Sequence, residues 1–255
     1  MKIQYASDLH LEFAENVKFI DRGKITPVGD VLVLAGDVSY LGDMKMVKRR
    51  FFDWCSEHFK ESLIVPGNHE FYGGYDIEKT MVGYEFNYRE NVRYLNNKSF
   101  VIGNTELFFT TLWTKISPLY LFDIQQGMSD FRYGRLKGGK LFANDVDGLH
   151  GRCMEWLETA LKASVAEHKI VVTHHCPTLR PEFDDHSGGV LNSAFHVDLD
   201  SFIERCGADY WIYGHTHFAG GSGSKIGKTT LLCNQMGYVF CNEHQAFNGT
   251  ACFEV

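Results

Sequence analysis

The feature of this sequence that most constrains its fold and its function is a set of polar turns, each of which directly follows a short predicted strand. Five short runs predict strands at residues 2–6, 30–35, 62–65, 169–173 and 209–213. The turns behind them contain Asp8-Leu9-His10, Gly36-Asp37, Gly67-Asn68-His69-Glu70, His174-His175 and Gly214-His215-Thr216-His217. Because ligands bind beyond the carboxyl ends of strands in open α/β sheets, we expect the five turns to meet at one site.

Each turn taken singly also has an ordinary structural interpretation. Asp-x-His and Gly-Asp are common in turns, Gly-Asn-His-Glu can begin a helix, and two alternate histidines can share one side of a strand. Six of the twelve histidines nevertheless fall in these turns. Their joint placement favours a metal site. Mixed imidazole and carboxylate ligands suit zinc, iron or manganese, and one carboxylate can bridge two ions.

Helical patterns alternate with strands in the first half of the chain. Asp43 is expected to cap a helix with Met44, Val47, Phe51, Trp54 and His58 or Phe59 on its apolar face. A weaker helix is expected at residues 76–89, and short strands at 92–95, 99–102 and 107–111. Residues 113–146 carry four glycines and are predicted to form an irregular insertion or long loop.

The second half continues the mixture of helices and strands. Asp147 is expected to cap an amphipathic helix whose apolar face extends to Val165. A short helix is expected at 197–206, and several antiparallel strands between 224 and 255. The sequence therefore predicts an α/β fold, a four-layer sandwich of two mixed β-sheets flanked by helices. With no linker or repeat, residues 1–255 are expected to form one domain.

The composition of the chain indicates which kinds of partner and cellular environment to expect. The net charge is −7, whereas non-specific binding to nucleic acid depends on many Lys and Arg contacts with phosphates. The seven cysteines are odd in number and include no Cys-x-x-Cys, which disfavours a disulfide framework and a tetrathiolate zinc site. Neither a signal peptide nor an apolar run of about 18 residues is visible. We therefore expect a cytoplasmic protein with no membrane segment and no nucleic-acid partner.

The order of the five motifs resembles the calcineurin-like metallophosphoesterase superfamily. Asp-x-His, Gly-Asp, Gly-Asn-His-Glu, a histidine after a strand and Gly-His-x-His span residues 8–217 with no motif missing. Looser matches to small bacterial-type members are Leu112-Trp113-Thr114, Asp130-Phe131-Arg132 and residues 234–238. As a set, the motifs are specific, although each of them is weak alone.

The resemblance implies a role for each residue of the motifs. Asp8, His10 and His217 would bind one metal ion, Asn68, His174 and His215 a second, and Asp37 would bridge them. His69 would face the substrate and Glu70 would support the site from behind. His174 is preferred over its neighbour His175 because it lies closer to the strand end, where the family ligand usually sits.

These roles predict a metal-dependent phosphoesterase that hydrolyses a phosphomonoester or phosphodiester. A hydroxide shared by two Mn²⁺, Fe²⁺/Fe³⁺ or Zn²⁺ ions would attack phosphorus. Asn68 would neutralise charge on the phosphoryl oxygens, and His69, as imidazolium, would protonate the leaving group. The expected partner is a small phosphorylated compound.

Residues 113–146 lie between the third and fourth motifs and are expected to rim the site. Their basic and aromatic residues fit either a substrate-binding lip, with Arg132 as the best candidate, or a solvated loop. The basic and aromatic side chains are Arg132, Arg135, Lys137, Lys140, Phe131 and Tyr133. Alternatives for the whole chain are a protein phosphatase, a nuclease, or a catalytically silent scaffold of this fold that binds partner proteins.

Overall fold

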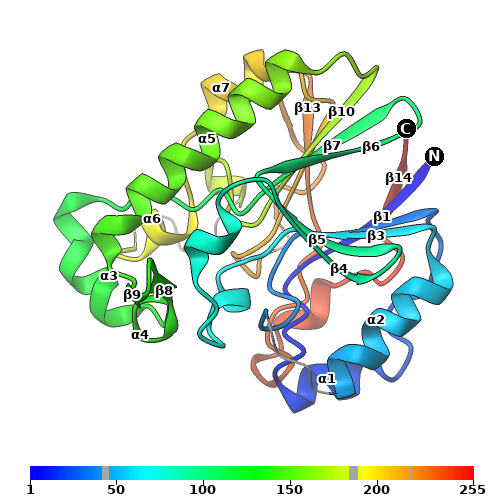
Figure 1. The fold of residues 1–255 in the computed structure, drawn as a ribbon, viewed down its shortest axis with the longest axis horizontal. Coiled ribbons are helices and arrows are strands. Elements are labelled where there is room, and N and C mark those ends of the chain that lie inside the picture. The colour runs from blue at the N-terminus through cyan, green and yellow to red at the C-terminus, as the bar shows by residue number, and fades with distance from the viewer. Residues whose placement is uncertain (42–45, 184–188, 219) are drawn as a thin grey trace.

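Two mixed β-sheets packed face to face form the centre of the protein. The computed structural model describes residues 1–41, 46–183, 189–218 and 220–255. Both main sheets have six strands, and helices cover their outer faces (Figure 1). This arrangement confirms the predicted α/β sandwich of two mixed sheets flanked by helices.

The first sheet has the strand order β14-β1-β2-β3-β5-β4. Its central strands β1, β2, β3 and β5 are parallel, whereas β14 and β4 pair antiparallel at the two edges. The bounds are β14 (Cys252–Glu254), β1 (Lys2–Ala6), β2 (Val31–Leu34), β3 (Glu61–Ile64), β5 (Val92–Asn96) and β4 (Tyr84–Arg89). Because β1 pairs with β14, the two termini lie side by side (Figure 1).

The second sheet has the order β12-β13-β11-β10-β7-β6. Strands β13, β11, β10 and β7 are parallel, and the edge strands β12 and β6 are antiparallel. The bounds are β12 (Lys225–Ile226), β13 (Thr229–Cys233), β11 (Tyr210–Tyr213), β10 (His168–Thr173), β7 (Thr105–Thr110) and β6 (Lys98–Ile102). The strands predicted at 2–6, 30–35, 62–65, 92–95, 99–102, 107–111, 169–173 and 209–213 are thus confirmed to within two residues at each end.

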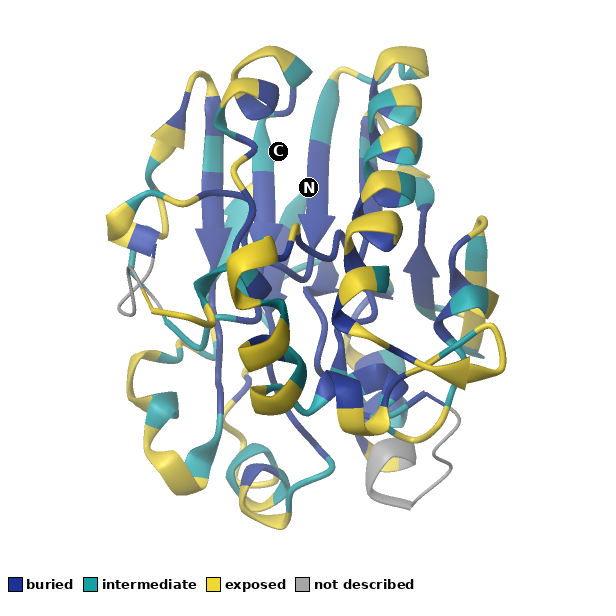
Figure 2. Ribbon diagram, turned by 90° about the vertical axis from the view of Figure 1, so that its left-hand side faces the viewer, coloured by how far each residue is buried: buried dark blue, intermediate teal, exposed yellow. Residues whose placement is uncertain are grey.

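The core has three layers because the central strands are covered on both faces. In β2, Val31 and Val33 face the other sheet, whereas Leu32 and Leu34 pack toward the outer helices. All four side chains are fully buried, which explains why this strand is a continuous apolar run in the sequence. Figure 2 shows the central strands as mostly buried and the outer faces of the helices as exposed. All seven cysteines are free, and four of them are buried.

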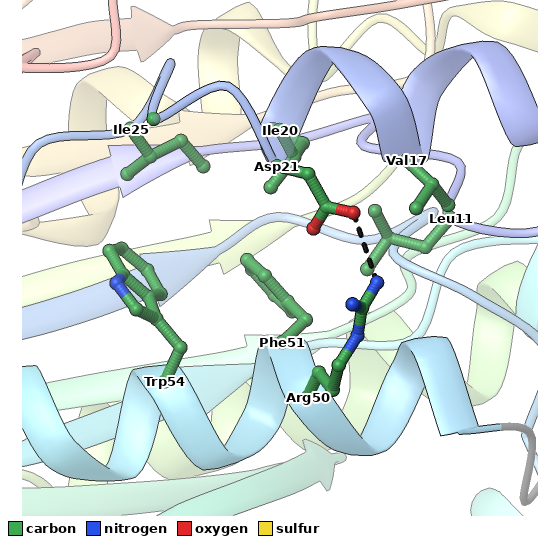
Figure 3. A pocket seen from close by; sticks show the side chains of 9 residues that line it. Leu11, Val17, Ile20, Asp21, Ile25, Arg50, Phe51 and Trp54 are labelled. Atoms are coloured by element: carbon green, nitrogen blue, oxygen red, sulfur yellow. Dashed lines mark hydrogen bonds and ion pairs between the residues drawn. The ribbon is translucent and has the colours of Figure 1, made fainter.

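Two pairs of helices form the outer layers. Helices α1 (Ala14–Ile20) and α2 (Met46–His58) lie on the first sheet, and α5 (Val146–Ala163) and α7 (Asp200–Cys206) lie on the second (Figure 1). A small cavity of about 230 Å³ separates α1 from α2, with an exposed Arg50–Asp21 ion pair of 3.0 Å beside it (Figure 3). In the described part of the chain, no helix combines the length and the apolar character needed to cross a bilayer.

The insertion at residues 113–146 is ordered, so the prediction of an irregular loop was wrong. It forms η3 (Pro118–Tyr120), α3 (Leu121–Gly127), α4 (Asp130–Tyr133), the two-stranded hairpin β8 (Arg135–Leu136) and β9 (Gly139–Lys140), and η4 (Ala143–Asp145). Ile124 and Phe131 anchor it in the core. The Asp76 carboxylate accepts N–H bonds from Lys137 and Gly138 in the hairpin turn. Tertiary contacts therefore order a glycine-rich segment.

The helix predicted at residues 76–89 was also wrong. A short turn, η2 (Ile77–Thr80), is followed by β4, which pairs antiparallel with β5. The Asp76 side chain caps η2 by accepting the Glu78 N–H at 2.9 Å. Pairing with a neighbouring strand outweighed the local helical pattern.

Other boundaries differ from the prediction for local reasons. Helix α5 begins at Val146, and Asp147 accepts the Ile116 N–H instead of capping the helix. Val165 lies beyond its end and is 99% exposed. Helix α7 begins at Asp200, and the tail forms β12, β13 and β14 together with η6 (Val239–Cys241) and η7 (Glu243–Ala246). Asp43 and Met44 and the side chain of Val47 lie outside the described residues, so that cap stays a prediction.

Candidate metal centre

The turns that follow five parallel strands meet between the two sheets. His174, after β10, places its Nδ1 2.8 Å from the carbonyl oxygen of Ala35, after β2. The backbone N–H of His215, after β11, donates to Asp8, after β1, at 3.1 Å. The structure therefore brings together the side chains that the sequence predicts as ligands, which are Asp8, His10, Asp37, Asn68, His174, His215 and His217.

The first group of candidate ligands contains Asp8, His10 and His217. The Nε2 atoms of His10 and His217 lie 3.0 Å apart. Their Nδ1 atoms face carboxylates, Glu12 at 3.0 Å and Glu243 at 2.6 Å. Because a carboxylate accepts the proton of each Nδ1, the two Nε2 atoms turn lone pairs toward each other when both rings are neutral. A cation beside them relieves this repulsion, so the group fits a metal ion.

The second group contains Asp37, His174 and His215, with Asn68 beside them. In its neutral form, His174 donates from Nδ1 to a carbonyl, so its Nε2 is then an acceptor that faces the Oδ1 atoms of Asn68 at 3.0 Å and Asp37 at 3.4 Å. The Nε2 of His215 is buried and has no hydrogen-bond partner among the described residues. Several acceptors that converge without a donor again fit a cation.

Asp37 lies between the two groups. Its Oδ2 is 3.8 Å from the His10 Nε2, and its Oδ1 is 3.4 Å from the His174 Nε2. Burial opposes ionisation of Asp37, but the imidazoles of His174 and His69 outweigh it and hold the pKa of the carboxyl well below its usual range. A permanently ionised carboxylate in this position is suited to bridge two ions.

The electrostatics of both groups favour positive charge. Burial alone would lower the pKa of His174, but the Asp37 carboxylate raises it to about 9. Burial likewise opposes protonation of His217, and the hydrogen bonds to Asp8 and Glu243 raise its pKa to about 10. The centre is therefore rich in negative charge, as a site for cations must be.

His69 lies beside the first group, where a third possible metal-binding set, with His10 and Asp37, includes it. Its Nδ1 is 2.8 Å from Glu12 Oε1, which also faces the Nδ1 of His10. Its Nε2 lies 3.2 Å from the hydroxyl of Tyr238 and 4.0 Å from Asp37 Oδ2. Burial disfavours the imidazolium, but Asp37 and Glu12 outweigh it and raise the pKa of His69.

The backbone at the strand ends is strained where the candidate ligands lie. Left-handed φ angles occur at Asp8 (57°), His10 (46°), Asp37 (52°), His215 (74°) and His217 (53°). This conformation costs a non-glycine residue about 1–2 kcal/mol. Among the described residues, five of the ten non-glycine residues with a left-handed φ lie at this site, and such strain tends to cluster at functional sites.

Glu70 anchors two of the turns from behind. Its carboxylate accepts N–H bonds from Asp37, Val38 and Gly67 at 2.8–2.9 Å. Burial and the nearby Asp37 raise its pKa to about 7. Its bonds to backbone amides are consistent with the supporting role that the resemblance implies.

His175 is the neighbour of His174 in the chain, but it makes different hydrogen bonds. Its Nδ1 lies 3.0 Å from the carbonyl oxygen of Thr111, and its ring packs between Trp113 and His215. Burial and the neighbouring His174 lower its pKa to about 3. Among the described residues, the possible metal-binding groups contain His174 and not His175.

The centre opens into a cavity of about 550 Å³. Asp37, Asn68, His69, His215 and His217 line one part of its wall. The insertion contributes Gly127, Met128, Ser129 and Asp130, so it does lie at the rim of the site. Arg132 is exposed and donates to the Gln126 carbonyl oxygen at 3.4 Å, outside the lining. Its role in substrate binding stays a prediction.

Four side chains at the site were not singled out by the sequence. Glu12 follows His10 by two residues, so the run Asp8-Leu9-His10-Leu11-Glu12 contained a signal for it. Tyr72 donates to Asp130 at 2.9 Å, and Tyr238 belongs to the loosely matched segment 234–238. Glu243 reaches His217 from η7, and nothing local in the sequence indicates that contact.

Comparisons with known proteins agree with this geometry. The family model for calcineurin-like phosphoesterases matches residues 1–219. "Uncharacterized protein L509" of Acanthamoeba polyphaga mimivirus is 25% identical over 282 residues, which cover 99% of this chain and 96% of that protein.

Two solved structures are similar to this chain at low sequence identity. Phosphopantetheinyl hydrolase (PptH) from Mycobacterium tuberculosis superposes with a TM-score of 0.69 at 15% identity, covering 99% of this chain and 95% of that one. A dimetal phosphatase from Danio rerio gives a TM-score of 0.45 at 15% identity, covering 92% and 87% of the two chains. At this identity, the likeness to PptH shows the shared fold alone.

Proposed function

The chain belongs to the calcineurin-like phosphoesterase family, and we propose that it is a metal-dependent phosphoesterase that hydrolyses a small phosphomonoester or phosphodiester. The observation that carries the proposal is the convergence of three imidazole Nε2 atoms, those of His10, His174 and His217, on the carboxylates of Asp8 and Asp37. Carboxylates that raise the pKa of His174 and His217 attract a metal ion as they attract a proton, and the donor set suits zinc, iron or manganese.

Asp8, His10 and His217 would hold one ion, Asn68, His174 and His215 a second, and Asp37 would contact both. Bound metal ions supply Lewis acidity, which activates water and neutralises charge on phosphoryl oxygens. The side chains of Glu12 and Glu243 hold protons on the far nitrogens of His10 and His217, which keeps the near nitrogens free to bind.

His69 is proposed as the general acid. Glu12 holds one proton on Nδ1, so the second proton of the imidazolium resides on Nε2, the atom that faces Asp37 and Tyr238. The raised pKa favours the imidazolium form, which carries this second proton. Transfer of the proton from Nε2 to the leaving oxygen completes the cleavage of the ester.

Asn68 is proposed to contact the phosphoryl group as well as a metal ion. Its Oδ1 faces His174 Nε2, while its Nδ2 donates to the hydroxyl of Tyr72 at 3.0 Å. Tyr72 in turn donates to Asp130, so the amide is held in one orientation. An oriented amide beside the reacting group stabilises charge without reorganising in the transition state.

The test is a screen of chromogenic mono- and diesters, such as 4-nitrophenyl phosphate and bis-4-nitrophenyl phosphate, with Mn²⁺, Ni²⁺, Zn²⁺ or Fe²⁺. Asp37→Ala serves as the blank. We expect metal-dependent release of nitrophenol by the wild type and none above background by the variant. A purified protein that binds no transition metal and remains inactive after addition of Mn²⁺ supports the scaffold function instead.

A further inference from the structure

The cavity beside the metal centre has an apolar wall that starts directly at the candidate ligands. The ring of Phe195 stacks on His215, with ring centroids 4.6 Å apart and an interplanar angle of 25°. Met128, Val190 and Leu191 continue this wall. A Cβ built on Gly127 would lie 3.4 Å from the Leu191 Cδ2, so the segment before α6 (Asn192–Phe195) touches the end of α3. The wall is therefore continuous across two segments that are distant in the sequence.

Part of this apolar wall is open to solvent. Val190 is 42% exposed and Leu191 is 37% exposed, although both line the cavity. Apolar side chains that face a cavity next to a polar centre gain free energy when an apolar group covers them. A volume of about 550 Å³ is in the range of small-molecule sites.

The apolar wall formed by Met128, Val190, Leu191 and Phe195 holds no cation for a second anionic group. Among the described residues, the whole lining contains no lysine and no arginine. Its acidic groups beyond the candidate ligands are Asp130, which accepts from Tyr72, and Glu243, which pairs with His217. Its imidazoles beyond the candidate ligands are His69, which faces Asp37, and His196. A second phosphate or a carboxylate on a ligand would lose its hydration against Leu191 and Phe195 and would be repelled by Asp130.

We propose that this cavity selects phosphoesters whose organic part is uncharged and apolar, and that it rejects esters with a second anionic group. The selectivity rests on the proposed function, because it places the phosphoryl group at the candidate metal ligands. The organic part lies against Met128, Leu191 and Phe195. Sugar bisphosphates and nucleoside polyphosphates are excluded as substrate classes by the same argument.

The binding test compares two ligands that cannot be hydrolysed and that differ in one carboxylate. Hexylphosphonate and 5-carboxypentylphosphonate are titrated by calorimetry into the Mn²⁺-loaded wild-type protein. We expect hexylphosphonate to bind at least about tenfold more tightly, because a buried carboxylate without a partner is costly. Equal binding, or tighter binding of the carboxylated ligand, overturns the proposal.

A pair of matched variants distinguishes an effect of the cavity wall from an effect of the protein's net charge. Leu191→Arg places a cation in the wall and is expected to remove most of the tenfold difference. Leu119→Arg makes the same change in net charge at a leucine that is 84% exposed on η3 and outside the lining, and it is expected to keep the difference. An equal loss in both variants overturns the proposal. If Leu191→Arg does not fold, Leu191→Ala is expected to weaken only hexylphosphonate.

Turnover of hexyl phosphate and 5-carboxypentyl phosphate is measured separately from binding. If the protein binds hexylphosphonate more tightly but hydrolyses neither ester, the proposed selectivity stands and the proposed function is rejected. If the protein hydrolyses both esters but binds the two phosphonates equally, the proposed selectivity is rejected and the proposed function stands. The two proposals therefore fail in different measurements.

Discussion

The Nε2 atoms of His10 and His217 lie 3.0 Å apart, although the two residues come from different sheets. Glu12 and Glu243 hold protons on the opposite nitrogens, so neither ring offers a proton to the other while both are neutral. A proton or a metal ion between the two facing lone pairs relieves their repulsion. The folded state is thereby linked to the binding of a positive ion.

Metal ions are expected to stabilise the fold. Mn²⁺ at 100 times its dissociation constant adds about 2.7 kcal/mol to the free energy of unfolding if it binds only the native state. Differential scanning fluorimetry should show a higher melting temperature with Mn²⁺ than with EDTA, and His217→Ala should shrink the difference. His58→Ala changes an exposed histidine on α2 and serves as the control. Identical melting temperatures with and without metal would contradict the linkage.

His69→Ala is expected to retain the metal ions and to lose most turnover. The side chain lies beside the candidate ligands His10 and Asp37, and loss of a general acid costs about 10²–10⁴-fold in rate. Elemental analysis of the purified variant gives the metal content, and steady-state kinetics with a chromogenic ester give kcat. A variant that loses metal to the same extent as activity would assign His69 to the metal ligands.

His174→Ala and His175→Ala separate two neighbours that the sequence alone ranks only by their distance from the strand end. The His174 Nε2 faces Asn68 and Asp37, whereas His175 bonds to a backbone carbonyl. We expect the first variant to bind about half as much metal per chain as the wild type and the second to bind the full amount. His175→Ala should instead lower the free energy of unfolding by about 1 kcal/mol, because it removes a buried side-chain hydrogen bond to the Thr111 carbonyl oxygen. The reverse pattern of metal content would exchange the two roles.

The sequence was informative where a strand is buried on both faces. Such strands are continuous apolar runs, so the run containing Val31 and Val33 could be recognised without a partner strand. The candidate ligands follow from the same strands, because the carboxyl ends of parallel neighbours meet at one edge. Asp8, Asp37 and His174 were therefore placed together from their positions in the chain alone.

Contacts that depend on the path of a loop were not predictable in this way. Glu243 meets His217 from a tail that forms short turns, and the two residues are 26 positions apart. Strand β4 was mistaken for a helix because its stability comes from pairing with β5. The insertion was predicted to be irregular because it contains four glycines. That prediction gave too little weight to side chains such as Phe131, which anchor the segment in the core.

Glu12→Gln is expected to shift the pH dependence of kcat. Burial disfavours the charged form of His69, but Asp37 and Glu12 outweigh it and raise its pKa. A general acid is active when protonated, so activity falls as pH rises through this pKa. Removing the charge of Glu12 lowers the pKa, and the alkaline limb of the profile should therefore move to lower pH. The measurement is kcat between pH 5 and 9.

Glu15→Gln is the matched control for this change. Glu15 is exposed at the start of α1, three residues from Glu12, and its replacement removes the same charge from the surface. We expect its pH profile to match that of the wild type. If the alkaline limb of the kcat profile of Glu12→Gln stays in place or moves to higher pH, the assignment of His69 as the general acid is contradicted.

Gly67→Ala is expected to disrupt the metal centre, although it adds a single methyl group. A Cβ at Gly67 would lie 2.2 Å from Asp37 Oδ1 and 2.7 Å from the Cε1 of His174, so both side chains must move. Metal content and turnover should fall together. Gly148→Ala provides the contrast, because its Cβ meets nothing within 4 Å on helix α5. That variant should keep its metal and gain about 0.5–1 kcal/mol in the free energy of unfolding, measured with urea, because alanine loses less backbone entropy in a helix. Retention of full metal content by Gly67→Ala would show that Asp37 tolerates displacement and does not have to lie between the two groups of ligands.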